Sequence, residues 1–497
     1  MSLLKKLQAI MIQNIKQNSK IIIGGTTLSI IGWIILRKYL DKSYRKINNY
    51  PPGLIGLPVF GCLFKNLDNK FFKYLSSNFG GVVMLQMGFR YVTYINDCNI
   101  TKKAFKKIEF CGREPQSFSV PTLAQLNGQK FIKRRQIFLR SFISMINSDY
   151  VTDIGNETLQ MHLFTEFDKN AAIKKPVLIR SYMRYTAYVM IHKILFGNYI
   201  EIFKMNGKEY KDFARMLNTI DENIFNARLW EYGLKPFFIS SINITFIKGF
   251  TNISKLTAKF EEKYKNTANT DVINGKHEPL LATLIKQDIH KLTLAADTSV
   301  VFGGGINTPS LLLTKIIIIL SAYVDIQEQV YNELKNYENK YGGFKLKNIH
   351  ELHYLRAVVH EVLRSQAKNS SLDRYILKKN ITLNGYNIPK GSLVYANYQY
   401  ISHDNNNWFD GDNILNIDNF LDDNNHFKQN PAFVAFGTGK RSCPGESLAI
   451  RNTYYFLSKI ILRYKISASN NVINTIKHSV NSEIKWESLP IIFEKRS

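Results

Sequence analysis

A ten-residue run near the C-terminus, FGTGKRSCPG at positions 436–445, constrains this chain more than any other feature of it. Glycines let such a loop turn tightly and approach a bound group closely. Backbone N–H groups that point at the sulfur of Cys443 would tune a metal ion bound there. Arg441 can offer a forked contact to a carboxylate, and residues 447–461 predict a helix whose positive N-terminal end is directed at the thiolate. The run predicts a fixed loop that presents a thiolate ligand, with a buried free cysteine beside a glycine turn as the alternative.

The run resembles the heme-binding signature of the cytochrome P450 family, F-x-x-G-x-R-x-C-x-G, and matches each fixed position. The resemblance implies heme b, iron protoporphyrin IX, with Cys443 as the ligand of the iron. It also implies that residues of the run contact the cofactor, namely Phe436, Gly437, Arg441 and Gly445. A thiolate ligand pushes electron density toward the iron and favours cleavage of the O–O bond.

Charge and cysteine content bear on partners and compartment. Lys and Arg number 66 against 39 Asp and Glu, a formal net charge of +27, which favours anionic partners such as membrane lipid or an acidic redox protein. We find no zinc-finger, RNA-recognition or helix-turn-helix signature and expect no nucleic-acid partner. The cysteines are too few and too scattered for a disulfide framework and indicate a reducing compartment; they are Cys62, Cys98, Cys111 and Cys443.

Residues 1–46 predict a membrane anchor with its flanks. The uncharged residues 21–36 would rise about 24 Å as a helix, against ~30 Å for a hydrocarbon core, and Trp33 and Tyr39 can extend the span into the interface. Basic residues on both sides only slightly favour a cytosolic catalytic domain. We expect a single-pass anchor in the endoplasmic reticulum membrane. A mitochondrial transit peptide, because the first 20 residues lack acids, and a buried core helix are the alternatives.

Residues 47–497 predict one catalytic domain, because neither a Pro/Gly/Ser linker nor an internal repeat follows residue 65. The proline-rich residues 50–58 resemble the hinge that follows the anchor in microsomal members of the family. The resemblance as a whole implies a mainly α-helical cytochrome P450 fold with a smaller β region, preceded by the transmembrane helix.

A predicted helix over residues 348–364 carries an E-x-x-R motif. Glu361 and Arg364 lie three apart, so they share a helix face and can pair; by itself such a pair is usually solvated. Its place upstream of the cysteine loop resembles the family's E-x-x-R helix, which braces the heme core. Asn419 stands where a third arginine of the family's brace is expected, so we predict a weaker or differently built brace.

The oxygen site is expected on a long buried helix, because residues 311–320 are strongly apolar. The family pattern is [A/G]-G-x-[D/E]-T, and two windows compete for it. Residues 295–298 keep the acid, Asp297, but lack the central glycine. Residues 304–308 keep the small residues and the threonine, and their spacing to Glu361 favours this second window.

In the favoured window Gly304 and Gly305 leave room for dioxygen, and Thr308 relays protons during oxygen activation. Asn307 replaces the acid and can hold a water molecule but not donate a titratable proton. Pro309 predicts a kink in the helix. A glycine loop or helix break without any chemistry is the alternative.

Two further arginines resemble propionate ligands of the family. Residues 128–135 resemble the W-x-x-x-R helix, in which Arg135 would bind a heme propionate and Phe131 replaces the tryptophan. Arg374 occupies the place of a strand residue that often makes such a contact, with a surface arginine as the alternative. Residues 386–394 predict a strand, a turn and a second strand. Lys133, Arg134 and Lys440 predict a basic patch near the thiolate, or else ordinary solvated charges.

The resemblance covers residues 50–495 and implies a monooxygenase. It would insert one atom of O2 into an apolar small molecule with NADPH electrons delivered by NADPH–cytochrome P450 reductase. The departures at Asn307, Phe131 and Asn419 keep two alternatives open: a reductase-independent heme-thiolate isomerase or dehydratase, and a low-turnover heme-binding membrane protein. Apolar substrate contacts are expected from residues 117–126, 213–246 and 367–372.

Overall fold

The computed structural model describes residue 43 and residues 45–496 with several gaps, which are 58–59, 64, 66, 115–121, 147–149, 223–240, 268–277, 288, 368–373, 378 and 479–483. Only the backbone is described at 144, 216–222, 241–250 and 346. The predicted membrane anchor in residues 21–36 lies outside the described residues. So do large parts of the three segments from which we expect substrate contacts.

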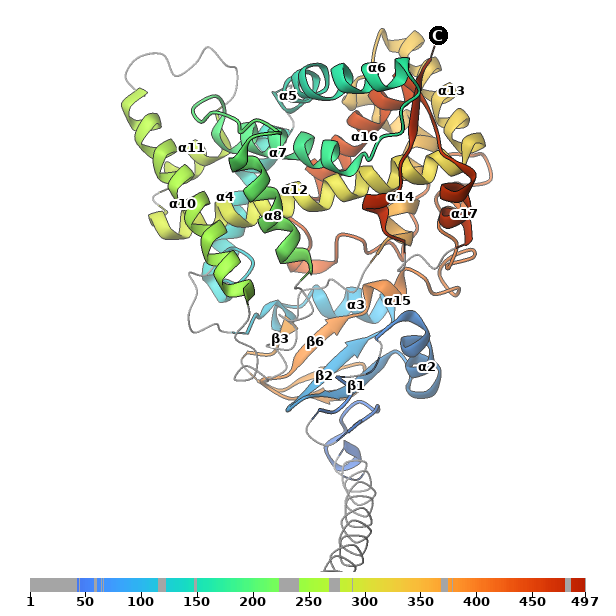
Figure 1. Cartoon of the computed structure of the whole chain (residues 1–497). Coiled ribbons are helices and arrows are strands. Elements are labelled where there is room, and N and C mark those ends of the chain that lie inside the picture. Colours follow the sequence, from blue (N-terminus) through green and yellow to red (C-terminus); the bar gives the residue numbers. More distant parts are fainter. Residues whose placement is uncertain are drawn as a thin grey trace, which may run out of the picture.

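Helices make up most of the molecule and a small sheet lies at one end, so the predicted fold class, mainly α with a smaller β region, is confirmed (Figure 1). The α-helices in the described part of the chain are α2 (Asn69–Phe79), α3 (Cys98–Phe105), α4 (Gly128–Ile146), α5 (Tyr150–Thr158), α6 (Thr165–Ala172), α7 (Arg180–Phe196), α8 (Lys208–Glu222), α10 (Ser241–Thr267), α11 (Leu280–Ile285), α12 (Lys291–Ala322), α13 (Val324–Tyr341), α14 (His353–Ser365), α15 (Tyr398–Ile401), α16 (Glu446–Arg463) and α17 (Asn470–His478). Shorter turns of 3-10 or π-helix are η1 (Ile108–Cys111), η2 (Leu159–Phe164), η5 (Leu346–Glu351), η6 (Ile417–Phe420), η7 (Gly439–Arg441) and η9 (Trp486–Ser488).

Helix α12 crosses the middle of the helical part and packs most extensively on α7 (Figure 1). It is long and apolar enough to cross a membrane, but 78% of its most apolar window is buried inside the protein, which makes it a core helix. Residues 303–305 lie within α12, so the alternative of a glycine loop or helix break is wrong. The helix continues through Pro309.

Among the described residues the strands form three small sheets. The strands are β1 (Val82–Met87), β2 (Arg90–Ile95), β3 (Arg374–Tyr375), β4 (Ile381–Leu383), β5 (Tyr386–Ile388), β6 (Leu393–Ala396), β7 (Tyr464–Ser467) and β8 (Ile492–Lys495). The largest sheet has the order β1-β2-β6-β3, with β2 and β6 parallel. The predicted strand, turn and strand in residues 386–394 are confirmed as β5 and β6. The two strands enter different sheets, because β5 pairs with β4 while β6 lies between β2 and β3.

The sheet has an apolar cluster of its own, in which Phe72 and Leu75 of α2 join Val83, Leu85 and Val92. The larger core lies among the helices. The sheet therefore adjoins the helical part without sharing most of its core. Val82 of β1, Ile95 of β2 and Val394 of β6 are buried in the larger core.

Helices α14 and α16 bring the two strongest motifs into the core. The helix predicted over residues 447–461 is confirmed as α16. The one predicted over 348–364 begins later than expected, at His353, after the 3-10 turn η5. The carboxylate of Glu333 explains this start, because it accepts the N–H groups of Tyr354 and Leu355 at 2.9 Å each and so satisfies donors that have no partner within the helix.

Candidate active site

The predicted cysteine loop folds into a tight turn that runs through η7 to the start of α16. The amide of Cys443 donates to the carbonyl oxygen of Phe436 across 2.9 Å, which closes the loop. Gly437 has a φ of +71°. Gly439 has a φ of +74°, and a Cβ atom there would lie 2.0 Å from the carbonyl oxygen of Phe105, so only glycine fits. The backbone that presents the sulfur is thus fixed by close contacts.

The sulfur of Cys443 accepts hydrogen bonds from the backbone N–H groups of Gly445 and Glu446, where α16 begins. Many protein atoms lie close to Cys443, but one side of the residue is open, so solvent or a ligand can reach its side chain. Burial is the largest influence on the pKa of the thiol and raises it, while the two N–H groups and the charge of Arg135 lower it. A thiol in this setting becomes a stable thiolate when a metal cation binds it.

Arg441 belongs to the cysteine loop itself, whereas Arg135 reaches the loop from α4. Arg441 donates from Nε to the carbonyl oxygen of Cys111 at 2.9 Å and from Nη1 to that of Ala124 at 3.2 Å. Arg135 lies on α4 and donates to the carbonyl oxygen of Ser442 at 2.7 Å. Of the three arginines predicted to contact the heme, Arg441 therefore lies in the loop that carries the sulfur and Arg135 lies beside it.

Arg113, which the sequence analysis missed, joins Arg135, Arg374 and Arg441 in a cluster of four arginines. The pKa of Arg441 falls to about 9, first because the side chain is buried and then because Arg113, Arg374 and Arg135 carry the same charge. The charged groups with the largest effect on the pKa of Arg441 are these arginines and the thiol of Cys111. Concentrated positive charge of this kind fits a doubly anionic partner. The cysteine loop and the four arginines together fit heme, with its iron on the sulfur and its propionates on the arginines.

Phe131 packs against this cluster from α4. Its ring is buried, and the guanidinium carbon of Arg441 lies 3.4 Å from the ring centroid. The ring thus replaces the family's tryptophan with an aromatic face on which an arginine stacks, a favourable contact between a cation and a π system. What the substitution removes is one N–H donor.

Helix α12 is mostly buried, but two residues of the favoured window are exposed. Gly304 and Thr308, one turn apart, are exposed, whereas Ile306 between them is buried. A Cβ atom on Gly304 would meet no heavy atom within 4 Å. A Cβ atom on Gly305 would lie 2.6 Å from the side chain of Ile191 on α7. Gly304 therefore leaves open space beside the helix, and Gly305 makes room for α7.

The two candidate windows for the oxygen site differ in the burial and the hydrogen bonds of their polar side chains. Thr298 is buried, and its hydroxyl donates to the carbonyl oxygen of Leu294 at 2.8 Å. Asn307 is also buried, and its amide oxygen accepts from Arg180 at 3.3 Å. Of the two threonines, Thr308 is the one whose side chain is accessible.

Asp297 connects α12 to the segment that holds the arginine cluster. Its carboxylate accepts the N–H of Leu123 at 2.7 Å and the Nε of Arg134 at 2.8 Å. Burial raises the pKa of Asp297, and Arg134 opposes that shift. The next residue after Leu123, Ala124, accepts from Arg441. For Arg134 the alternative of an ordinary solvated charge is wrong, because its side chain is mostly buried in this ion pair with a buried carboxylate.

Glu361 and Arg364 form a fully buried ion pair on α14, so the interpretation of a solvated pair is wrong. Arg364 donates to both carboxylate oxygens at 2.7 Å. It also donates to the carbonyl oxygens of Ser402 and Gly411 at 2.7 Å each. The pair therefore ties α14 to two loops that lie beyond β6 in the chain.

Asn419 occupies the place of the third arginine in this brace. Its Nδ2 lies 3.3 and 3.4 Å from the two carboxylate oxygens of Glu361, and its Oδ1 accepts the N–H of Phe409 at 2.7 Å. The N–H of Asn416 adds a further bond to Glu361 at 2.9 Å. Glu361 is thus bound by the amide donors of Asn416 and Asn419 as well as by the charge of Arg364.

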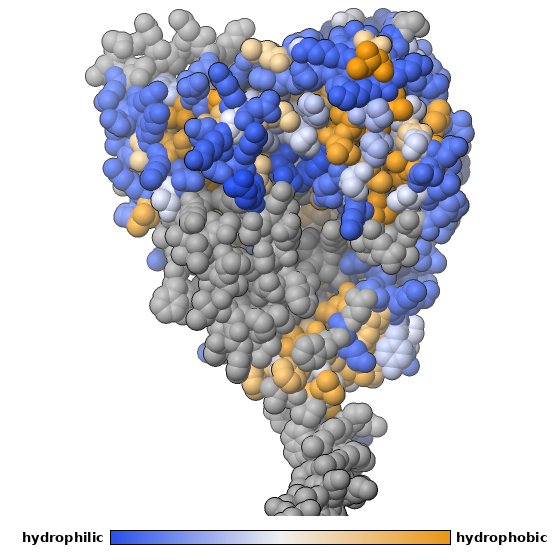
Figure 2. All heavy atoms as spheres, viewed as in Figure 1, coloured by the Kyte–Doolittle hydropathy of each residue, from blue (hydrophilic) through white to orange (hydrophobic). Residues whose placement is uncertain are grey.

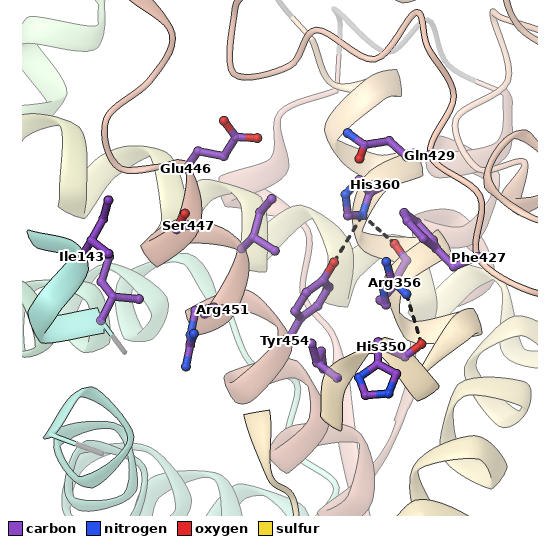
Figure 3. A pocket seen from close by; sticks show the side chains of 13 residues that line it. Ile143, His350, Arg356, His360, Phe427, Gln429, Glu446, Ser447, Arg451 and Tyr454 are labelled. Carbon is purple, nitrogen blue, oxygen red and sulfur yellow. Dashed lines mark hydrogen bonds between the residues drawn. The ribbon is translucent and has the colours of Figure 1, made fainter. Parts of the chain in front are cut away.

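A pocket of ≈ 390 Å³ lies between α4, α14 and α16 (Figure 3). The guanidinium of Arg356 stacks on Phe427 at 3.9 Å and donates to the carbonyl oxygen of His350. Burial lowers the pKa of His360, on the same wall, to about 4, so this imidazole is neutral at pH 7. The lining includes Glu446, whose N–H donates to the sulfur of Cys443. The pocket is therefore separate from the sulfur but shares the first turn of α16 with it.

Comparisons with known proteins identify the family of this chain. The family model described as Cytochrome P450 matches residues 51–492. The chain is 25% identical over 471 residues to Cytochrome P450 2C23 of Rattus norvegicus, covering 90% of this chain and 93% of that protein. It is 23% identical over 473 residues to Cytochrome P450 2L1 of Panulirus argus, covering 88% and 92%. A shorter match, 31% over 169 residues, is to Steroid 17-alpha-hydroxylase/17,20 lyase of Rana dybowskii and covers 33% of this chain and 32% of that protein.

The family model spans nearly the whole described chain, and the loop that matches its signature has the geometry that a thiolate ligand needs. Heme is the cofactor that this family implies, and the sulfur and the four arginines fit it. The chain therefore belongs to the cytochrome P450 family and is a heme-thiolate monooxygenase.

Proposed function

We propose that this monooxygenase is membrane-bound and inserts one atom of dioxygen into an apolar small molecule with NADPH electrons that reach it through a reductase. The single observation that carries the proposal is the sulfur of Cys443, held by two backbone N–H groups beside a cluster of four arginines. When bound there, heme supplies the redox and oxygen chemistry. The protein contributes by fixing the sulfur, neutralising the propionates and delivering protons.

Thr308 is the residue that we assign to proton delivery. Its side chain is exposed next to Gly304 on α12, whereas the hydroxyl of Thr298 is used within its own helix. The acid of the competing window, Asp297, is occupied by Arg134 and by the N–H of Leu123. These contacts support residues 304–308 as the oxygen site.

The first prediction tests the reaction and this assignment together. Membranes with the protein and a reductase should consume oxygen and NADPH and yield product. The variant Thr308→Val keeps the shape of the side chain but removes the hydroxyl, so NADPH electrons should leave as hydrogen peroxide. Product per NADPH should fall several-fold, because general acid–base groups contribute up to ~10²–10⁴ in rate. The matched control, Thr298→Val, should stay coupled.

The result also separates the alternatives. Turnover of an oxygenated substrate without reductase or oxygen would favour the isomerase or dehydratase. Absence of any turnover would favour a heme-binding membrane protein. Uncoupling in Thr298→Val alone would move the oxygen site to residues 295–298.

Delivery of electrons through a reductase is supported by positive charge near the cysteine loop. Arg356 and Arg451 line the pocket between α4, α14 and α16 (Figure 3). Lys440 precedes the cysteine by three residues and is exposed. With the net charge of +27, this face suits a partner with an acidic surface. The reductase is expected to bind there because electrons then enter close to the sulfur.

Membrane attachment rests on the predicted anchor and on exposed apolar residues at the sheet end of the molecule. Figure 2 shows a hydrophobic area over this end. Leu57, Phe60 and Phe89 are 54%, 42% and 62% exposed, and backbone contacts join them: Leu57 pairs with Gly61, and Gly88 donates to the carbonyl oxygen of Phe60. Together with the predicted anchor, they support residence in the endoplasmic reticulum membrane with the catalytic domain cytosolic. A mitochondrial location is the alternative.

The second prediction concerns the anchor. Deleting residues 1–42 should release the protein from membranes only partly, because Leu57, Phe60 and Phe89 still present an apolar surface. The deletion stops before Arg45, whose guanidinium donates to the carbonyl oxygen of Met84 at 2.9 Å and so belongs to the folded domain. Sedimentation with washed membranes measures the release. Adding Phe60→Ser and Phe89→Ser should complete it, and unchanged sedimentation of the deletion would show that the anchor lies elsewhere.

A further inference from the structure

A buried arginine from α7 contacts the turn of α12 that we assign to oxygen chemistry. Arg180 is the first residue of α7 and is 6% exposed. Its Nη2 donates to Oδ1 of Asn307 at 3.3 Å, and its Nη1 donates to Oγ of Ser310 at 2.6 Å. Both partners are buried, and the exposed Thr308 lies between them in the chain.

The chemistry of these groups fixes the orientation of the Asn307 side chain. A guanidinium group only donates hydrogen bonds, so the carboxamide must turn its oxygen toward Arg180. The NH2 group of the same carboxamide is then directed away from the cation. Asn307 is thereby held as a neutral hydrogen-bond donor whose orientation is set by a permanent positive charge.

Arg180 also supports the backbone of this turn. Pro309 has no N–H, so the α-helical bond from position 309 to the carbonyl oxygen of Gly305 is not made. Ser310 stabilises the same turn, because its Oγ lies 2.6 Å from the carbonyl oxygen of Ile306 and 3.0 Å from that of Asn307. Arg180 donates to this Oγ and thus fixes the hydroxyl in the position where it can make those contacts.

We propose that Arg180 is a positioning residue of the oxygen site. It holds the turn of Asn307, Thr308 and Ser310, and it fixes the amide of Asn307 as the polar group next to Thr308. The inference rests on the proposed function. It explains why asparagine is suited to position 307. A carboxylate there would form a buried ion pair with Arg180, and that pair would hold it ionised and unable to give up a proton at neutral pH.

The test compares Arg180→Met and Arg180→Lys with a matched control, Arg184→Met, one turn further along α7. Arg180→Met should lower product per NADPH several-fold and raise hydrogen peroxide, with little change in KM. Arg180→Lys should recover part of the coupling, because an ammonium group keeps the charge but not the fork that reaches both partners. Arg184→Met should stay coupled.

A second readout does not depend on turnover. Hydrogen exchange of the α12 amides around residues 306–310 should become about tenfold faster in Arg180→Met, which corresponds to the loss of about 1.4 kcal/mol from the two bonds. The ferrous–carbon monoxide spectrum should be unchanged, because the cysteine loop is intact. If Arg180→Met does not fold, Arg180→Gln, which keeps a neutral amide on a side chain too short to reach both partners, takes its place in both measurements.

The pH dependence distinguishes positioning from mere stability. Asn307→Asp alone should show coupling that is independent of pH between about 6 and 9, since Arg180 keeps the carboxylate ionised. Asn307→Asp combined with Arg180→Met should show coupling that rises as the pH falls, because the freed carboxyl group then titrates. Unchanged coupling in Arg180→Met with normal spectrum, or identical pH profiles of the two aspartate variants, would refute the role of Arg180. A wild-type protein that uses no oxygen with reductase would instead refute the proposed function, and the exchange rates would still report on the turn.

Discussion

Replacing Cys443 by alanine should abolish the strongly red-shifted Soret band of the ferrous–carbon monoxide complex and all monooxygenase turnover. The band reports a thiolate ligand, and in this chain the loop at residues 436–445 presents the sulfur of Cys443 with N–H donors from Gly445 and Glu446. Alanine removes the ligand, but the backbone hydrogen bond from residue 443 to Phe436 remains. The loop should therefore keep its shape while the spectrum is lost, as absorbance and circular dichroism can measure.

The matched control is Cys111→Ala. Cys111 is buried near the same arginine cluster, and its carbonyl oxygen accepts from Arg441 at 2.9 Å. That contact uses the backbone and survives the substitution. The control should keep both the red-shifted band and activity. A band that persists in Cys443→Ala and disappears in Cys111→Ala would show that Cys111, and not Cys443, is the ligand.

Glu361→Ala should be the most destabilising single substitution outside the cysteine loop. It leaves the guanidinium of Arg364 buried without its carboxylate, and breaking a buried pair in this way costs about 3–5 kcal/mol. A typical domain has roughly 5–15 kcal/mol of stability in total, so the variant should unfold at much lower urea concentration. It should also lose heme, because the brace ties α14 to loops that lead to the cysteine. Urea unfolding and the ratio of heme to protein absorbance measure both effects.

An exposed pair with the same spacing serves as the control. Glu166 and Lys169 also lie three residues apart on a helix and approach to 2.9 Å, but their side chains are 45% and 68% exposed. Glu166→Ala should change stability by less than about 1 kcal/mol, because solvent screens such pairs. Equal losses in Glu166→Ala and Glu361→Ala would contradict the role assigned to burial.

The Asn419 contacts predict a graded result within the brace. Asn419→Ala should cost less than Glu361→Ala, because its amide bonds to Glu361 are long, at 3.3 and 3.4 Å, and the N–H of Asn416 remains. The charge of the pair is untouched in this variant. We therefore expect the ion pair to contribute most of the stability of the brace and the amide of Asn419 to contribute less.

Part of the site was predictable from the local sequence, because some of its residues are placed by one loop or by one turn of a helix. The loop at 436–445 places Cys443 through the bond from its own amide to Phe436, a near neighbour in the chain. The spacing of Glu361 and Arg364 follows from helix geometry, and the apolar run after Thr308 predicts a buried helix. In each case the partners are a few residues apart, so periodicity and glycine positions suffice to place them.

Only the tertiary structure decided which distant groups meet. Arg113 and Arg374 join Arg441 through packing of separate elements, and no local pattern indicates that. Asp297 could be interpreted from the sequence as a proton donor, but in the folded protein its carboxylate accepts a hydrogen bond from Arg134. Arg180 and Asn307 are 127 positions apart. Contacts of this kind depend on how α4, α7 and α12 pack, and a buried charge takes whichever partner that packing supplies, because leaving it unpaired costs more than any local preference.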